Sequence, residues 1–274
     1  GDYNVAVGYQ ALDDNVTGSS KTAVGYQALQ NDTGASLSTA VGYHALGGQT
    51  TGLYNVALGY SAGGSVSTNG DNVFIGTTTG IATTGASNTM VGFQAGYDQT
   101  SGSNNLLLGK FAGRSSSPSG TITTGSNIVC LGDNSITDLY CADTTISSSD
   151  SRDKTDIENF SSGLDFIKKL RPVTYRWDKR SNYLTEDNDD LLSITPDGTH
   201  KESRQHLGFL AQEVEQIEKE FGYSESKDSQ LVVNTNEDDT AMGIKYERLV
   251  PVLVNAIKEL SAEIEKLKSQ LNQS

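Results

Sequence analysis

The first 148 residues contain no glutamate, and their acidic side chains are nine scattered aspartates. Glycoside hydrolysis needs two carboxyl groups facing one sugar bond, so this half is a poor candidate for a sugar-cleaving enzyme. Basic residues are scarce as well, with three in residues 1–148 and a net charge of −14 for the 274-residue chain. Nucleic-acid-binding proteins present a basic surface, and we therefore expect no nucleic-acid partner.

Cysteines and long apolar runs are also lacking. The two cysteines, Cys130 and Cys141, are too few for a disulfide framework. Cys130 replaces an apolar residue of a repeat, which favours a buried thiol; a bridge to Cys141 is the alternative and requires an oxidising compartment. No apolar run approaches the roughly 20 residues that cross a bilayer, so we expect no membrane insertion. We also expect no metal and no cofactor.

The first half consists of repeats, each marked by a glycine that follows a short apolar segment. These glycines are Gly8, Gly25, Gly42, Gly59, Gly76, Gly92, Gly109 and Gly132. Their spacing is 17 residues, except for 16 once and 23 once. Because the chain begins at Gly1 inside a repeat, we expect it to be part of a longer protein.

One repeat is too short to bury a core alone. An extended Val5-Ala6-Val7 segment points its two valines to one face and Ala6 to the other, and stacking aligns such residues into ladders. The glycine permits a sharp corner, and Asn, Ser and Thr supply the turns. The repeats therefore predict a parallel β-solenoid. Since Val, Leu or Ile precedes every marker glycine, we expect that position inside the coil, and the residue before it at a second buried surface, such as a subunit interface.

Residues 1–135 resemble the head repeats of trimeric adhesins of the YadA type, in which an aliphatic residue and a glycine end each strand. The resemblance implies a left-handed β-roll with three chains packed side by side. Tyr9, Tyr26, Tyr43 and Tyr60 recur at one place in successive repeats. We interpret them as a packing ladder within the trimer, and a strip that binds a host glycan or receptor is the alternative.

The second half is charged and does not repeat. Residues 164–170 read as a short helix, 173–177 as a strand, and 206–214 as a segment that runs into an amphipathic helix. A heptad pattern then predicts a coiled coil over residues 249–272. Its a positions are Val250, Ile257, Ile264 and Leu271, and its d positions are Leu253, Leu260 and Leu267. Ile at a with Leu at d favours two strands, but the repeats argue for a trimer.

Ser149 and Lys154 lie where the two halves meet. A serine hydroxyl and a neutral lysine amine can act as nucleophile and general base, and Ser151 is a rival nucleophile. Residues five apart do not face each other on a regular helix or strand. The segment must therefore bend, or the lysine of one chain must serve the serine of another. A plain polar linker is the alternative.

Three segments of the second half, in order, resemble the intramolecular chaperone of endosialidases and phage tail fibres, peptidase family S74. They are residues 149–157 (SDSRDKTDI), 170–177 (LRPVTYRW) and 208–214 (GFLAQEV), followed by the heptads. The resemblance implies autoproteolysis between Ser148 and Ser149, with Ser149 as nucleophile and Lys154 as base. His206 matches a position where the family often has histidine. The chain departs from the family in Asp153, where an aliphatic residue is usual, and in an enlarged 181–205 loop.

The combined expectation is a fibre domain at 1–148 and an α+β chaperone domain at 149–274 that ends in a trimeric coiled coil. The chaperone would drive homotrimerisation of a viral tail fibre in the host cytoplasm and then cut itself off once, as a single-turnover serine endopeptidase. The fibre would stay in the virion and bind a host-surface glycan or protein receptor, whereas the released chaperone would not be retained. The alternative is a trimeric cell-surface adhesin head with an uncleaved trimerisation domain.

Overall fold

The computed structural model describes residues 1–34, 37–136, 138–140, 149–185, 188 and 190–273. The chain forms two compact units. We call the first the solenoid unit; it comprises residues 1–137, 179–200 and 236–241. The second, called the C-terminal unit, comprises residues 138–178, 201–235 and 242–274.

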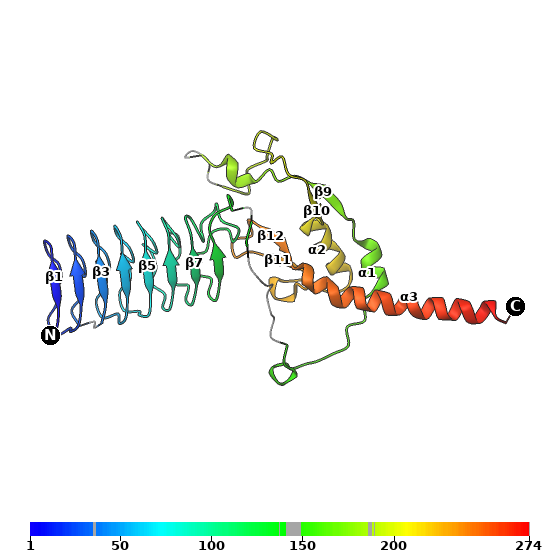
Figure 1. The fold of residues 1–274 in the computed structure, drawn as a ribbon, viewed down its shortest axis with the longest axis horizontal. Helices are drawn as coiled ribbons and strands as arrows, with labels where there is room; N and C mark the ends of the chain where they lie inside the picture. The colour runs from blue at the N-terminus through cyan, green and yellow to red at the C-terminus, as the bar shows by residue number, and fades with distance from the viewer. Residues whose placement is uncertain (35–36, 137, 141–148, 186–187, 189, 274) are drawn as a thin grey trace. The chain divides into compact units, whose positions relative to one another are not determined.

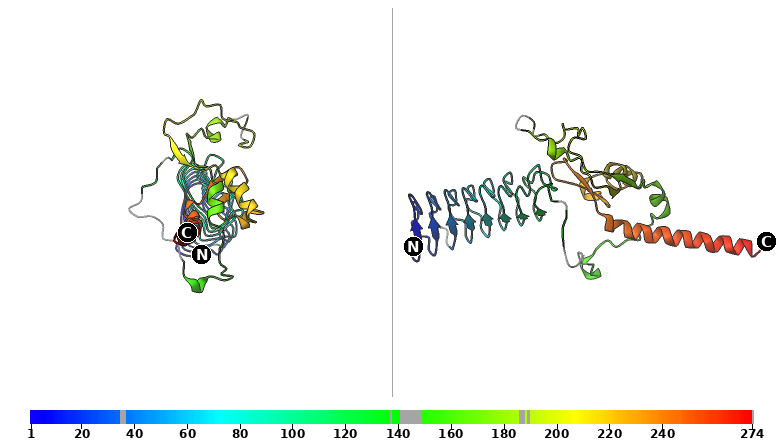
Figure 2. Two further views of the ribbon diagram at one scale, coloured as in Figure 1. Left: turned by 90° about the vertical axis from the view of Figure 1, so that its right-hand side faces the viewer. Right: turned by 45° about the horizontal axis from the view of Figure 1, so that its top comes forward.

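Eight short strands run parallel and in sequence order along the solenoid unit (Figure 1). They are β1 (Val5–Val7), β2 (Thr22–Val24), β3 (Thr39–Val41), β4 (Val56–Leu58), β5 (Val73–Ile75), β6 (Thr89–Val91), β7 (Leu106–Leu108) and β8 (Val129–Leu131). Equivalent repeat residues pair throughout, as Ala23 does with Ala40, and the coils superpose when viewed end-on (Figure 2). The predicted β-solenoid, with one coil per repeat, is confirmed.

The glycine after each strand is required because the next coil passes against it. Gly8 has φ +133°, and a Cβ there would lie 2.7 Å from the carbonyl carbon of Gly25. The same backbone approach recurs from Gly25 to Gly42. The position therefore needs both an unusual backbone angle and the absence of a side chain.

The side chains that fill the coils are those in the middle of strands β2 to β8. At most 4 % of the surface is exposed for Ala23, Ala40, Ala57, Phe74, Met90, Leu107 and Cys130. The residue before the glycine points outward instead, with Val7 57 % and Leu58 48 % exposed. Our assignment of these two positions is therefore wrong. In a three-residue strand, the alternation of side chains is compatible with either face pointing inward. The narrow interior accepts an alanine from the strand because a leucine fills the opposite side.

Large and small side chains exchange places along the interior. After each of the first three strands, Leu12, Leu29 and Leu46 fill the space beside the alanines. Later coils carry glycine at the leucine position, and Phe74 occupies the volume: a Cβ on Gly63 would lie 2.6 Å from its Cδ2, and one on Gly80 would overlap its ring. The backbone is conserved in the exchange, since φ is +60° at Gly63 and 48° at Leu46. The interior is thus filled by a leucine at the corner in the first coils and by a large side chain on the strand in the later ones.

A ladder of buried asparagines joins the coils. Asn72, Asn88 and Asn105 each donate a backbone N–H to the Oδ1 of the preceding asparagine, which is Asn55, Asn72 and Asn88 in turn, at 3.0, 2.9 and 3.1 Å. Nearer the N-terminus, the fully buried Lys21 ammonium lies 2.8 Å from the Asp32 carboxylate. Buried polar groups must be paired, and these pair only when the coils stack in this register.

Cys130 is a free buried thiol, as the first interpretation predicts. Its Sγ accepts a hydrogen bond from Ser119 Oγ at 3.4 Å. Cys141 lies outside the described residues.

The C-terminal unit contains three helices and two antiparallel strand pairs in its described part. They are α1 (Leu164–Lys169), β9 (Val173–Tyr175), β10 (His206–Gly208), α2 (Ala211–Glu220), β11 (Val233–Thr235), β12 (Met242–Ile244) and α3 (Leu249–Leu271). Strand β9 pairs with β10, and β11 with β12. The predicted helices are confirmed, and the strand predicted at 173–177 ends earlier, at Tyr175.

The core of this unit forms where α1 packs against α2 and α3. Its buried members are Phe166, Val214, Ile217, Val232, Val233, Leu249 and Val252. The Glu259 carboxylate of α3 accepts the Leu164 N–H at 2.7 Å. Gly163 makes this approach possible, since a Cβ there would lie 2.8 Å from the backbone nitrogen of Ala256.

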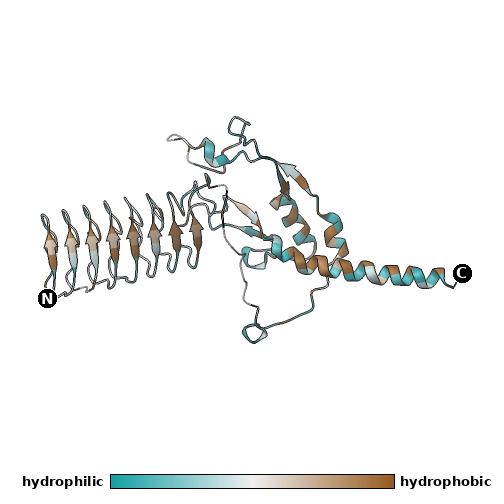
Figure 3. Ribbon diagram, in the orientation of Figure 1, coloured by the Kyte–Doolittle hydropathy of each residue, from teal (hydrophilic) through white to brown (hydrophobic). Residues whose placement is uncertain are grey.

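Helix α3 has two apolar faces. Leu249, Val252 and Ala256 face the core. All seven heptad residues, which we call the α3 seam, are exposed: Val250, Leu253, Ile257, Leu260, Ile264, Leu267 and Leu271. Hydrophobic residues recur along α3 to its end (Figure 3). In the described part of the chain, no helix has both the length and the apolar character needed to span a membrane.

Candidate functional site

A short 3₁₀ turn brings Ser149 and Lys154 together. The turn spans Ser151–Asp153, and the Asp150 side chain at its start accepts the Arg152 N–H at 2.9 Å. The chain bends enough for Lys154 Nζ to lie 2.7 Å from Ser149 Oγ. The sequence leaves open whether the segment bends or a second chain supplies the lysine, and in the single chain the segment bends. Ser151, the rival nucleophile, instead accepts the Lys154 N–H at its carbonyl.

An ion pair holds the turn from its other side. The Arg152 guanidinium donates to the Asp150 carboxylate at 3.0 and 3.1 Å from Nε. Hydrogen bonds from the side chain and then the backbone of Arg152 hold the pKa of Asp150 below its ordinary value. The hydrogen bond to Asp150 raises the pKa of Arg152. Asp150 is therefore a fixed anion whose charge is paired within the turn.

The Ser149 and Lys154 side chains are both exposed in the single chain. In the observed arrangement the amine donates its hydrogen to the hydroxyl oxygen. General-base catalysis needs the reverse, a neutral amine that accepts the hydroxyl proton. Lysines in water titrate near 10.4, and removal from water is the main way to lower that value. The geometry thus joins the two groups, and activation requires burial.

His206 lies on β10, where it contacts aromatic side chains. It pairs with Tyr175 across β10 and β9, stacks on that ring at 5.6 Å, and meets the Trp177 ring at 6.3 Å. Its Nε2 is buried, 4.0 Å from the Glu202 carboxylate, and has no hydrogen-bond partner among the described residues. No contact in this part of the chain joins it to the Ser149–Lys154 pair. A catalytic role for His206 stays a prediction.

The other two motif segments are held to each other. Arg171 donates from Nε to the Glu213 carboxylate at 3.1 Å, and the bonds with Glu213 raise the pKa of Arg171. Gly208 lies under Tyr246, whose hydroxyl accepts the Phe209 N–H at 3.2 Å; a Cβ on Gly208 would overlap that hydroxyl. The motifs at 170–177 and 208–214 therefore build the scaffold of the unit.

Sequence reasoning misses two residues that support the unit, Glu218 and Tyr175. The Glu218 carboxylate is completely buried and accepts N–H groups of Val232, Val233 and Leu231. Burial and then the nearby Tyr246 raise the pKa of Tyr175, which favours its neutral phenol. A glutamate on the apolar side of an amphipathic helix is the signal that could have identified Glu218.

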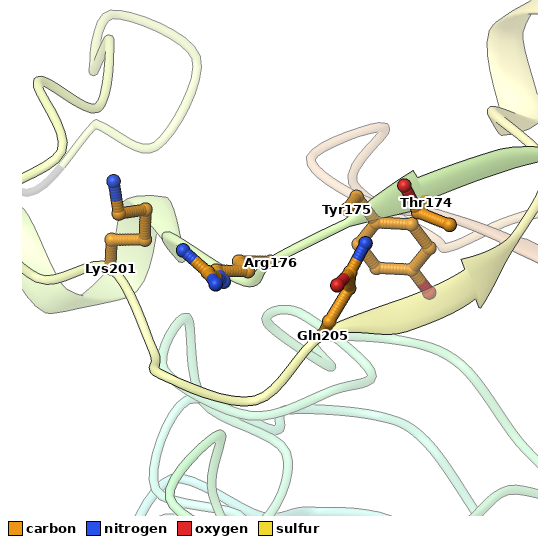
Figure 4. A pocket seen from close by; sticks show the side chains of 5 residues that line it. All are labelled: Thr174, Tyr175, Arg176, Lys201 and Gln205. Carbon is orange, nitrogen blue, oxygen red and sulfur yellow. The ribbon is translucent and has the colours of Figure 1, made fainter.

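An open pocket lies beside the β9–β10 pair. It is lined by Thr174, Tyr175, Arg176, Lys201 and Gln205. The Arg176 and Lys201 side chains lie on one side of it, and Tyr175 and Gln205 on the other (Figure 4). Neither Ser149 nor Lys154 lines it, so the pocket is not part of the predicted cutting site.

The motifs that form the turn and the scaffold fall within one stretch of sequence. Residues 149–223 match the chaperone of endosialidase family, peptidase S74. The match starts at Ser149 and confirms the resemblance. This family consists of self-cleaving intramolecular chaperones, which supports autoproteolysis. A chaperone of endosialidase also indicates a phage-associated protein.

The repeats and α3 lie outside the matched residues. The search for similar proteins gave no match among curated proteins or solved structures. Ser148, on the other side of the predicted scissile bond, lies outside the described residues. The nucleophile, the base and the cleavage position therefore stay predictions.

Proposed function

We propose that residues 149–274 bring three copies of the chain together, promote folding of the solenoid at 1–148, and then separate from it by cleavage between Ser148 and Ser149. The solenoid would remain as part of a tail fibre in the virion. The contact between Lys154 Nζ and Ser149 Oγ, 2.7 Å apart at the first residue of the family match, carries this proposal.

The chemistry needs only these two side chains and water. Ser149 Oγ attacks the carbonyl carbon of Ser148, so that an ester C–O bond forms and the peptide C–N bond breaks. Neutral Lys154 takes the hydroxyl proton and returns it to the departing nitrogen of Ser149. Water then hydrolyses the ester, which leaves a carboxylate on Ser148 and a free amine on Ser149. Each chain reacts once.

Assembly would act as the trigger. Lys154 is exposed in the single chain, and packing of chains around the turn would remove its amine from water. Cleavage would thus follow trimerisation rather than precede it. Removal of the chaperone then leaves a trimer that cannot refold by the same route, and its stability becomes kinetic.

Two exposed apolar surfaces support the trimer. One is the α3 seam, and the other is the stripe of outward aliphatic residues on β1–β8, which includes Val7 and Leu58. Contiguous exposed apolar surface of this kind is typical of protein interfaces. Since repeat residues pair in register along the whole sheet, identical chains could match it coil for coil.

The tyrosine ladder borders this stripe in the sequence. Tyr9, Tyr26, Tyr43 and Tyr60 stack with centroids 5.0 to 5.3 Å apart, and all four are exposed in the single chain. We favour packing within the trimer because Tyr9 follows directly on Val7-Gly8. A host glycan or receptor that stacks on the rings is the second interpretation.

Mass spectrometry of the freshly folded chain tests the cut. We expect fragments of 148 and 126 residues from the unaltered protein, and one intact chain from Ser149→Ala and from Lys154→Ala. Hydroxylamine added during folding would convert the ester into a hydroxamate at the new C-terminus of Ser148.

Ser151→Ala is the matched control, because it removes a hydroxyl from the same turn and leaves the 2.7 Å pair in place. We expect this variant to cleave normally. An intact unaltered chain in a trimer would favour the uncleaved adhesin head, and cleavage in Ser149→Ala would eliminate the proposed nucleophile.

A further inference from the structure

The last coil of a solenoid has no following coil to accept its hydrogen bonds. At one corner of several coils, a threonine N–H donates to the carbonyl of the next coil, as Thr84 does to Thr100 at 2.7 Å and Thr100 to Thr123 at 2.7 Å. Thr123 lies in the corner that precedes β8, and we count this corner together with β8 as the eighth coil. Backbone donors left without acceptors are costly unless water or another group replaces the missing coil.

Glu237 supplies acceptors at this corner of the eighth coil. It lies in the turn that connects β11 to β12, and this turn, residues 236–241, belongs to the solenoid unit. Its carboxylate accepts the Thr124 N–H at 2.9 Å, the Gly125 N–H at 2.9 Å and the Thr124 hydroxyl at 2.6 Å. One side chain thus engages consecutive donors of coil eight.

The threonine hydroxyls follow the same succession. Those of Thr33, Thr84 and Thr100 donate to the carbonyl of the next coil, the last of them at 3.0 Å. The Thr123 hydroxyl, next in line, donates to Glu237 Oε1 at 3.1 Å. A carboxylate oxygen therefore stands where the series calls for a carbonyl oxygen.

The corner glycines give an independent indication. A Cβ on Gly85 would overlap the carbonyl oxygen of Gly102, and one on Gly102 would overlap that of Gly125. A Cβ on Gly125 would lie 2.5 Å from Glu237 Oε2. The carboxylate again occupies the place of a next-coil carbonyl.

The rest of the turn is built to hold this position. Asp238 Oδ2 accepts the Thr121 N–H at 2.9 Å, and Asn236 Nδ2 donates to the Ser119 carbonyl at 3.0 Å. Asn236 also closes the turn on itself, by accepting the Ala241 N–H at 2.9 Å. Gly120 gives it room, since any side chain there would overlap Asn236.

We propose that residues 236–241 are an end cap of the solenoid, in which the Glu237 carboxylate replaces the carbonyl oxygens of a ninth coil. The cap is a non-covalent ligand for coil eight carried by the C-terminal half of the chain. It gives the Thr121, Thr124 and Gly125 amides of the last coil their acceptors while the solenoid folds. This inference stands whether or not the chain cuts itself.

Hydrogen–deuterium exchange on the full chain tests the cap, with Ser149→Ala present so that both halves stay linked. We expect the Thr121, Thr124 and Gly125 amides to be protected. In Glu237→Ala/Asp238→Ala they should exchange at least about tenfold faster, because charge-assisted hydrogen bonds are lost. Glu225→Gln, which alters an exposed carboxylate outside the cap, should leave them unchanged.

A substitution in coil eight tests the contact from the other side. Gly125→Ala should displace the carboxylate and speed exchange at Thr124, whereas Gly34→Ala should not, since its Cβ would meet only Thr17 Oγ1, at 3.6 Å. Unprotected Thr124 and Gly125 amides in the Ser149→Ala chain would overturn the cap. So would normal protection in Gly125→Ala. The exchange measurements on the Ser149→Ala chain and on Gly125→Ala can be interpreted even if the carboxylate variants fail to fold.

Discussion

Replacing Ile257 by aspartate should separate assembly of the chains from folding of each chain. Ile257 belongs to the α3 seam and is 65 % exposed, whereas Val252, close by on the same helix, is buried in the core of the C-terminal unit, and Ala256 is buried as well. A polar residue at 257 therefore removes nothing from that core. It places a charge where three seams are proposed to meet.

The magnitude follows from the exposed area. Full burial of an isoleucine side chain is worth about 1.5–3 kcal/mol, so burial of the exposed 65 % contributes about 1–2 kcal/mol per chain. Three chains lose about 3–6 kcal/mol of association free energy, or roughly two to four orders of magnitude. Three aspartates brought together add a desolvation cost in the same direction.

Analytical ultracentrifugation and circular dichroism measure the two properties separately. We expect Ile257→Asp to sediment as a single chain with the helix content of the unaltered protein, and to remain uncleaved because Lys154 stays exposed. Ala262→Asp puts the same residue on the outer face of α3 and should assemble and cleave normally. A trimeric Ile257→Asp protein would refute the assignment of the seam, and a cleaved single chain would refute the coupling of the cut to assembly.

Two further perturbations address the solenoid. Phe74→Ala should lower the free energy of unfolding, measured by urea denaturation, by about 3–5 kcal/mol. Adding Gly63→Leu should restore part of this loss, because the two substitutions together recreate the alanine-and-leucine packing of the first coils. Gly63→Leu alone should be destabilising, and a double variant no more stable than Phe74→Ala would contradict the proposed exchange of side-chain volume. Cap protection should also depend on pH: burial opposes ionisation of Glu237 and Asp238, but their hydrogen bonds outweigh it and hold both pKa values below the ordinary ones. Stabilisation is then complete above the ordinary carboxyl values of about 4 and is lost as pH falls through the lowered ones. Exchange protection factors of Thr124, corrected for the intrinsic rate at each pH, should fall below about pH 4 and should do so less in a Glu237→Gln chain, whose weaker cap does not titrate at that position.

The acidic transition of the cap involves more groups than the two carboxylates. Asp239 lies in the same turn, and the Arg180 guanidinium donates to the carbonyl of Thr240. Loss of the carboxylate charges therefore changes the charge balance around this guanidinium as well. A sharper fall in protection than one titrating group gives would reflect this neighbourhood.

Repetition explains why the solenoid is predictable and why its interior is not. Eight glycines at nearly constant spacing predict stacked coils, because stacking places the equivalent residues of successive repeats in register. The same repetition says nothing about which strand face is inside. Three-residue strands with apolar residues on both faces satisfy either choice, and the decision rests on volume. Alanine fits inside while a leucine fills the opposite corner, and Phe74 fits once Gly63 and Gly80 make room.

The candidate site shows the complementary case. Sequence motifs predict Ser149 and Lys154 as a pair and leave open whether the segment bends. They do not specify a 3₁₀ turn, because its only local signal is Asp150 ahead of Arg152. His206 follows from the motif alone, and in the single chain its contacts are Tyr175 and Trp177 instead. The cap could not be read from the sequence. Glu237 contacts residues 112 to 114 positions earlier, and an acidic turn between two short strands looks like any solvated loop.

Glutamate is absent from residues 1–148, and the carboxylate that completes coil eight comes from the other half of the chain. A ninth coil would satisfy the same donors permanently, but it would expose donors of its own. A carboxylate ends the series because it accepts hydrogen bonds but has no N–H group that would need an acceptor in a further coil. Once the proposed cut removes the tether, the donors at this partly exposed corner can turn to water at modest cost. The cap would therefore be needed while the coils form and could be lost afterwards, which is what a chaperone that leaves its product requires.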